Sequence, residues 1–222
     1  MTRNGSLIGV RPEYEERYII LHKHVFPEVL DQIRKSNIRN YSIFLRDGML
    51  FSYFEYAGKD FEGDMKAMAA DQTTQEWWKL CIPMQDPLPG RKEGEWWASI
   101  EEVFHMGDLK KPSYKAKRFA SVIDLDPASE AEYKKLHAAV WPAVLDQIRK
   151  SNIQNYSIYL YEHRLYSYFE YVGDDFAGDM AKMAQDPETQ RWWGVCKPLQ
   201  RKVPGAREDE WWSEMKEVFH TD

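Results

Sequence analysis

The stretch from Tyr18 to Tyr41, YIILHKHVFPEVLDQIRKSNIRNY, is written a second time from Tyr133 to Tyr156, as YKKLHAAVWPAVLDQIRKSNIQNY. Each copy begins with a tyrosine that is followed four residues later by a histidine. On a helix this spacing places both side chains on one face, about one turn apart. An aromatic-proline pair and an amphipathic helical pattern follow, and an Asn-Tyr pair opens a predicted strand. A histidine and a phenol placed in this way suit proton transfer on a small polar molecule.

The repeat extends well beyond this stretch. Residues 6–107 align without a gap on residues 121–222, and more than half of the aligned positions are identical. Because solenoid repeats run to about 20–50 residues, each copy is a whole folding unit. We therefore expect one module at 1–106, a polar, Lys-rich linker at 107–117 and a second module at 118–222. Two such copies resemble a homodimer fused into a pseudo-dimeric monomer, with further homo-oligomerisation left open.

The composition is typical of a soluble protein with a packed core. Of 222 residues, 43% are hydrophobic and 14% aromatic. The net charge of −6 and the lack of a basic block argue against nucleic acid or anionic membranes as partners. There is no apolar run long enough for a membrane span and no apolar signal-peptide core at the N-terminus. Two cysteines are too few for a disulfide framework, so we expect a cytoplasmic location.

The coarse pattern of each module is β-α-β-β-α-β. In the first copy we predict a strand at 6–10, a helix from Pro12 to about residue 36 that bends near Pro27, strands at 40–45 and 50–56, helices at 61–70 and 71–81, and a last strand at 101–105. This order is ferredoxin-like. Neither face of the central hairpin is polar, so both must be covered. The predicted fold is α+β: two ferredoxin-like modules packed sheet to sheet as an intramolecular dimeric α/β barrel.

Several separated motifs together resemble the L-rhamnose mutarotase family. They are Tyr18-x-x-x-His22, Phe26-Pro27, Asn40-Tyr41, Trp77-Trp78, the loop Lys92-Glu93-Gly94-Glu95-Trp96-Trp97 and the closing Glu101-Glu102-Val103-Phe104. The resemblance covers nearly all of each copy. It implies an isomerase that interconverts the α and β anomers of L-rhamnose, a small-molecule sugar, without a cofactor. This chain differs from the usual single-module members in being a tandem fusion, and in holding Phe26 where the second copy has Trp141.

The resemblance also implies roles for residues of both copies. The proton donor falls on His22 and His137. The sugar-binding residues fall on Tyr18, Tyr41, Trp77 and Trp78 in the first copy and on Tyr133, Tyr156, Trp192 and Trp193 in the second. Histidine suits a reaction that runs in both directions, because its ordinary pKa lies near ambient pH. Neighbouring residues of a helix point about 100° apart, so we expect one tryptophan of each pair to face the sugar and the other to pack.

Other polar residues are weaker candidates. Glu55 and Glu170 lie between tyrosines on a strand, where a hydrogen bond to a tyrosine or a solvated position is the simpler interpretation. We expect His24, His105 and His220 at the surface and Cys81 and Cys196 in the core. No histidine or cysteine group has metal-ligand spacing, so no metal is predicted. Trp96-Trp97, with Trp211-Trp212, are expected to close over a pocket or to pack on the partner module.

Two other classes of function remain open. The dimeric α/β-barrel arrangement also serves cofactor-free oxygenases and enzymes of lactone or polyketide chemistry. Alternatively, the chain is a sugar-binding or sensory module whose histidine only forms hydrogen bonds. The fold cannot choose among these, because function resides in the site.

Overall fold

The computed structural model of the chain describes residues 1–107 and 116–222, which form two compact units. Unit 1 comprises residues 1–100 and 216–222, and unit 2 comprises residues 101–215. Most of the linker predicted at 107–117 lies outside the described residues, and its last residue, Lys117, already belongs to a strand.

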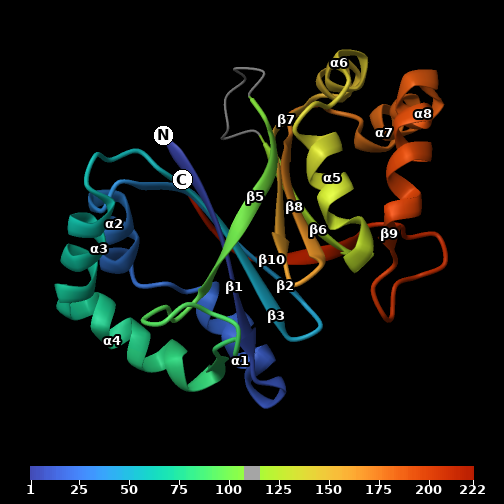
Figure 1. The fold of residues 1–222 in the computed structure, drawn as a ribbon. Coiled ribbons are helices and arrows are strands. Elements are labelled where there is room, and N and C mark those ends of the chain that lie inside the picture. The colour runs from blue at the N-terminus through green and yellow to red at the C-terminus, as the bar shows by residue number, and fades with distance from the viewer. Residues whose placement is uncertain (108–115) are drawn as a thin grey trace. The chain divides into compact units, whose positions relative to one another are not determined.

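Both units have the predicted order β-α-β-β-α-β, with each helical region divided into two helices. Unit 1 contains β1 (Thr2–Val10), α1 (Glu15–His22), α2 (Pro27–Lys35), β2 (Ile38–Arg46), β3 (Met49–Tyr56), α3 (Phe61–Ala70), α4 (Gln72–Cys81) and β4 (Gln85–Asp86). Unit 2 contains β6 (Lys117–Leu125), α5 (Glu130–His137), α6 (Pro142–Lys150), β7 (Ile153–Tyr161), β8 (Arg164–Tyr171), α7 (Phe176–Gln185), α8 (Pro187–Cys196) and β9 (Gln200–Arg201). Helices α5, α6 and α8 lie on one side of the strands β6–β8 (Figure 1).

The first helical region is broken at its proline and does not merely bend there. Phe26 has an extended backbone, with φ −58° and ψ 132°, and Pro27 is the first residue of α2. The proline ring disfavours a helical conformation for the residue before it, and its missing N–H is tolerated only in the first turn of a helix. The predicted continuous helix is therefore two helices, and α1 ends at His22.

Two strands are shared between the units. The start of β5 (Ala98–Met106) pairs with β1 in unit 1, whereas residues 101–106 pair with β7 in unit 2. In the same way, the start of β10 (Ser213–Thr221) pairs with β6 in unit 2, and residues 216–221 pair with β2 in unit 1. The compact units consequently do not share the boundaries of the sequence repeat.

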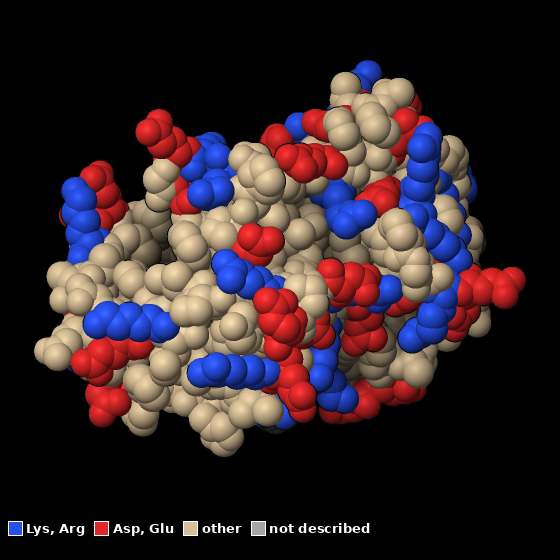
Figure 2. Space-filling model, turned by 90° about the horizontal axis from the view of Figure 1, so that it is seen from below, with Lys and Arg blue, Asp and Glu red and all other residues tan. Residues whose placement is uncertain are grey.

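The strand pairing is that of a closed antiparallel barrel. Neighbouring strands follow the order β10-β2-β3-β1-β5-β7-β8-β6, and β10 pairs with β6 as well. The α+β class and the barrel predicted from the sequence are therefore confirmed. No helix within residues 1–107 and 116–222 is long and apolar enough to cross a membrane. On the face seen in Figure 2, acidic and basic side chains are intermixed and form no field of one sign.

A bulge in the second strand of each unit sets the direction of one predicted site residue. The pairing of β2 with β3 shifts between Arg39 and Ser42, and Asn40 has a φ of 48°. Asparagine tolerates this left-handed conformation better than most residues. The extra residue re-aims the strand locally, so Tyr41 shares a side with Phe54, its ring centroid 5.7 Å away. Asn155 has the same φ and Tyr156 the same relation to Phe169.

Candidate active sites

Each unit contains a cavity, and the two cavities are lined by equivalent residues. The cavity of unit 1, here called the first site, has a volume of about 500 Å³, and that of unit 2, the second site, about 330 Å³. All ten site residues predicted from the sequence line these cavities. They are Tyr18, His22, Tyr41, Trp77 and Trp78 in the first site and Tyr133, His137, Tyr156, Trp192 and Trp193 in the second.

Helix α1 brings the tyrosine and the histidine together as the spacing predicts. The ring of Tyr18 stacks on the imidazole of His22, with centroids 3.9 Å apart and planes inclined by 24°. Tyr133 and His137 of α5 are also 3.9 Å apart, at 22°. The histidine of each pair is the last residue of its helix, and its imidazole lines the cavity.

A backbone hydrogen bond fixes the tautomer of each histidine. Nδ1 of His22 lies 2.9 Å from the carbonyl oxygen of Tyr18, and the equivalent distance at His137 is 3.0 Å. A carbonyl oxygen only accepts, so Nδ1 donates and carries the proton. Burial lowers the pKa of both histidines to about 4, against the opposing effect of this hydrogen bond. At neutral pH the ring is therefore uncharged, and Nε2 is an unprotonated base.

The stacked tyrosines carry a polar group that the fold leaves unsatisfied. The hydroxyls of Tyr18 and Tyr133 are buried, and neither has a hydrogen-bond partner within the described part of the chain, although Gln85 and Gln200 lie near them. Burial, followed by the nearby Tyr41 or Tyr156, raises the pKa of each phenol well above its ordinary value. A buried, unpaired hydroxyl costs about 1–3 kcal/mol, so its presence in both copies points to a ligand that hydrogen-bonds to it.

Both tryptophans of each pair line the cavity of their unit. Which of them faces a sugar stays a prediction. Trp77 is buried and meets the imidazole of His22 edge-on, with centroids 5.2 Å apart. Trp78 is 36% exposed and lies at the entrance. The two indoles follow the cavity from its depth to its mouth. Together they offer apolar surface to the C–H face of a sugar and two N–H donors.

The exchanged strand ends place a phenylalanine against the histidine and the second tyrosine of each site, and the sequence did not identify this phenylalanine as a site residue. Phe219 of β10 lies edge-on to His22 at 6.0 Å and to Tyr41 at 5.4 Å. In unit 2, Phe104 of β5 lies 5.9 Å from His137 and 5.5 Å from Tyr156. Both belong to the motif EVFH, which is identical in the two copies. This identity is the sequence feature that could have indicated a role for the phenylalanine in the site.

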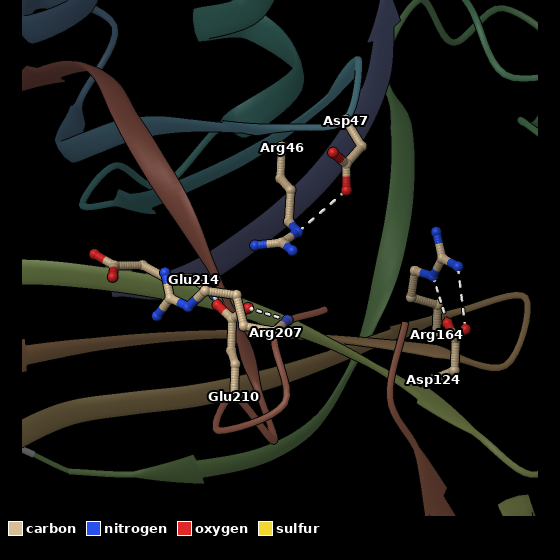
Figure 3. Close-up of polar contacts among 7 residues, drawn as sticks. All are labelled: Arg46, Asp47, Asp124, Arg164, Arg207, Glu210 and Glu214. Atoms are coloured by element: carbon tan, nitrogen blue, oxygen red, sulfur yellow. Dashed lines mark hydrogen bonds and ion pairs between the residues drawn. The ribbon is translucent and has the colours of Figure 1, made fainter. Parts of the chain in front are cut away.

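A glutamine and a carboxylate hold the tryptophan loop over each cavity, and these were also missed. Trp96 donates from Nε1 to Gln85 Oε1 at 2.7 Å, and Trp211 donates to Gln200 at 3.1 Å. The carboxylate of Glu210 is buried and accepts from the backbone N–H groups of Glu214 at 2.7 Å and Arg207 at 3.3 Å (Figure 3). The loop tryptophans Trp96, Trp97, Trp211 and Trp212 all line the cavity of their own unit.

Glu55 and His220 do not line the cavities, whereas Cys81 and Cys196 do. Glu55 accepts hydrogen bonds from Asn40 Nδ2 and from the Tyr53 hydroxyl, both at 3.0 Å, which fits the simpler interpretation. His220 is bonded to Ser42 at 2.9 Å. Cys81 and Cys196 are free thiols and buried, as predicted, and burial raises the pKa of both to about 12. Across residues 1–107 and 116–222, no group of three or more His, Cys, Asp or Glu side chains is arranged to hold a metal ion.

Comparison with solved structures defines the class of fold. A structure assigned as a monooxygenase from Lactobacillus acidophilus aligns over 100% of this chain and 96% of its own, with a TM-score of 0.56 and 6% identity. One from Fusobacterium nucleatum, also assigned as a monooxygenase, aligns over 99% and 93%, with a TM-score of 0.55 and 11% identity. At such low identity the likeness concerns the fold alone, which is the dimeric α/β barrel.

Comparison of sequences defines the family. The family model for L-rhamnose mutarotase matches twice, at residues 3–106 and 118–221. A curated L-rhamnose mutarotase from Listeria monocytogenes is 32% identical over 104 residues, which are 47% of this chain and 97% of the relative. The chain thus belongs to the L-rhamnose mutarotase family, as a tandem pair of modules, and is an isomerase of the mutarotase type.

Proposed function

We propose that both sites catalyse the interconversion of the α and β anomers of L-rhamnose or a related 6-deoxy sugar such as L-fucose, without a cofactor. The observation that carries this proposal is present in both units. An unpaired, buried phenol hydroxyl is stacked on an imidazole whose Nδ1 is anchored to the backbone. The mostly apolar lining suits a sugar that has a methyl group in place of one hydroxyl.

The proposed reaction opens and recloses the hemiacetal. Nε2 of the neutral imidazole takes the proton of the anomeric hydroxyl, C1–O5 breaks, and a C1 carbonyl forms. The imidazolium gives the proton to O5 as it leaves C1, so that O5 becomes the hydroxyl of C5. The Tyr18 or Tyr133 hydroxyl stays protonated and donates a hydrogen bond to the ring oxygen as negative charge develops on it. Rotation about C1–C2 and the reverse steps give the other anomer.

Saturation-transfer NMR tests this function directly. Anomer exchange is measured on L-rhamnose, L-fucose, D-glucose and D-galactose with and without protein. We expect acceleration for one of the 6-deoxy sugars and a loss of about 10²–10⁴-fold in the His22→Ala, His137→Ala double variant. His24→Ala is the matched control, because His24 is exposed and the second copy already has alanine there. Full activity of the double variant would refute the role of both histidines.

We further propose that the chain acts in the cytoplasm as a pseudo-dimer in which one polypeptide supplies both sites. The support for the compartment is that both cysteines are free, as expected under reducing conditions. The support for the pseudo-dimer is that each unit holds a full set of five site residues, namely one histidine, two tyrosines and two tryptophans. Each single variant, His22→Ala or His137→Ala, should then retain the exchange due to the other site.

A further inference from the structure

The two sites differ in charge at one position of their lining. Ile82 lines the first site, and Lys197 stands at the same place in the second. Each follows directly after its helix, α4 or α8, one turn beyond the second tryptophan of the pair. Among the described residues that line either cavity, Lys197 is the only one with a permanent charge.

Lys197 is held at the mouth of the second site by aromatic contacts. Its ammonium nitrogen lies 5.5 Å from the ring centroid of Trp193 and 5.8 Å from that of Trp211, both of which line the cavity. It makes no ion pair with any carboxylate of the described residues. A lysine ammonium has three donors, and contact with two ring faces uses none of them in a hydrogen bond. The charge is thus positioned but not neutralised.

A second cation near this site is already paired. Arg191 lies 5.4 Å over the ring of Trp141, and its guanidinium forms an ion pair with Glu188 at 2.8 Å. Glu76 stands at the equivalent position of the first repeat. Among the residues that the structure describes, only Lys197 therefore offers the second site an unneutralised positive charge at the cavity itself.

On the basis of the proposed function, we infer that the second site accepts an aldose that carries a carboxylate at the end remote from C1, a hexuronate. The reacting carbon must lie at His137, which is largely buried, so the far end of the sugar extends toward the mouth, where Lys197 lies. There one ammonium group matches one carboxylate in charge. At the same position Ile82, 41% exposed, offers the first site an apolar contact for the methyl group of a 6-deoxy sugar.

The test compares D-galacturonate with D-galactose, which differ only at C6, as competitors of L-rhamnose exchange. His22→Ala leaves only the second site active, and His137→Ala leaves only the first. We expect D-galacturonate to compete about fivefold better than D-galactose at the second site and no better at the first. The preference should shrink as salt rises from 10 mM to about 0.5 M, since the lysine is exposed.

The exchange of one residue between the sites provides the matched control. Lys197→Ile in the His22→Ala background should abolish the preference, and Ile82→Lys in the His137→Ala background should create it. Each inhibition is normalised to the L-rhamnose exchange of the same variant. Equal competition by both sugars at the second site, or a preference that survives Lys197→Ile, would overturn the inference while leaving the mutarotase proposal intact.

Binding measured by calorimetry separates the two proposals from each other. If L-rhamnose exchange is not accelerated at all, the proposed function fails. Calorimetric titration of the His22→Ala protein with D-galacturonate, with and without Lys197→Ile, still decides the inference. Binding that weakens about fivefold in the variant supports a carboxylate site, and binding unchanged by the substitution contradicts it.

Discussion

At the scale of single residues, the decisive feature is an imidazole that the fold keeps neutral. Its Nδ1 is committed to the carbonyl oxygen of the tyrosine one turn earlier, and burial lowers its pKa to about 4. The same histidine in water would be partly protonated at pH 6.5. The environment thus makes Nε2 a base throughout the neutral range.

This lowered pKa predicts how stability depends on pH. Between pH 6.5 and about 4 the unfolded chain binds a proton at His22 that the folded chain does not bind, so the free energy of unfolding falls on acidification through this window. We expect a loss of about 1–3 kcal/mol for each histidine. Urea unfolding at pH 7 and pH 4.5 measures it.

The double variant His22→Gln, His137→Gln is the comparison for that experiment, because glutamine does not titrate. Its stability should fall less than that of the unaltered protein over the same window. An identical pH dependence in both proteins would show that carboxylates alone cause the change.

The unpaired phenol hydroxyls give a second prediction at this scale. Tyr18→Phe, Tyr133→Phe removes two buried, unsatisfied groups, so stability should stay the same or rise by about 1 kcal/mol per site. Anomer exchange should nevertheless fall by at least about tenfold, because the donor to the ring oxygen is lost. Thermal unfolding and NMR exchange are measured on the same sample. A variant that loses stability together with activity would assign the hydroxyls to the fold.

At the scale of elements, local backbone chemistry aims the site residues. The helical region before Pro27 is divided, because the residue that precedes a proline disfavours the helical conformation. His22 is therefore the last residue of α1 and does not lie inside a longer helix. The bulge at Asn40 turns Tyr41 to the side of Phe54 and Phe219. The helix break depends on Pro27, whose ring restricts the backbone, and the bulge depends on Asn40, which tolerates a left-handed conformation.

The bulge predicts that glycine is more stabilising than alanine at Asn40, the reverse of their usual order of stability within a helix. At Asn40, with φ 48°, Asn40→Gly keeps the left-handed conformation and Asn40→Ala strains it, so the alanine variant should be less stable by about 1 kcal/mol. At Lys79, exposed in α4, the order should be opposite, with glycine less stable than alanine by about 1 kcal/mol. Chemical denaturation of the four variants checks this. The same order at both positions would argue against the bulge.

At the scale of the whole molecule, the two repeats depend on each other through exchanged strand ends. Residues 216–221 follow the second repeat in sequence but pair with β2 in unit 1, and residues 101–106 pair with β7 in unit 2. The histidine of each site is therefore in ring contact with a phenylalanine from the other repeat.

Because of this exchange, we expect a mutation in one repeat to lower the activity of the site in the other repeat. Phe219→Ala should lower anomer exchange in the His137→Ala background, where only the first site works, and have little effect in the His22→Ala background. Phe104→Ala should do the reverse. We expect a loss of about 3–30-fold in each affected case, since a misplaced catalytic group costs up to about 10² in rate. Effects confined to the repeat that carries the mutation would contradict the exchange.

The sequence by itself determined the repeat, the α+β class, the order of the elements and all ten residues predicted to line the sites. The repeat, the class and the order of the elements follow from local signals, namely the hydrophobic period and the motifs repeated in each copy. The ten site residues were named from the resemblance of these motifs to a family, and all ten line the cavities. Tertiary structure alone decided which strand ends are exchanged, and hence that Phe219 packs against His22 and Phe104 against His137. It also decided that the histidines are neutral, and that Lys197 lies over two indoles. Strand partners and burial depend on residues far apart in the chain, which no local pattern encodes.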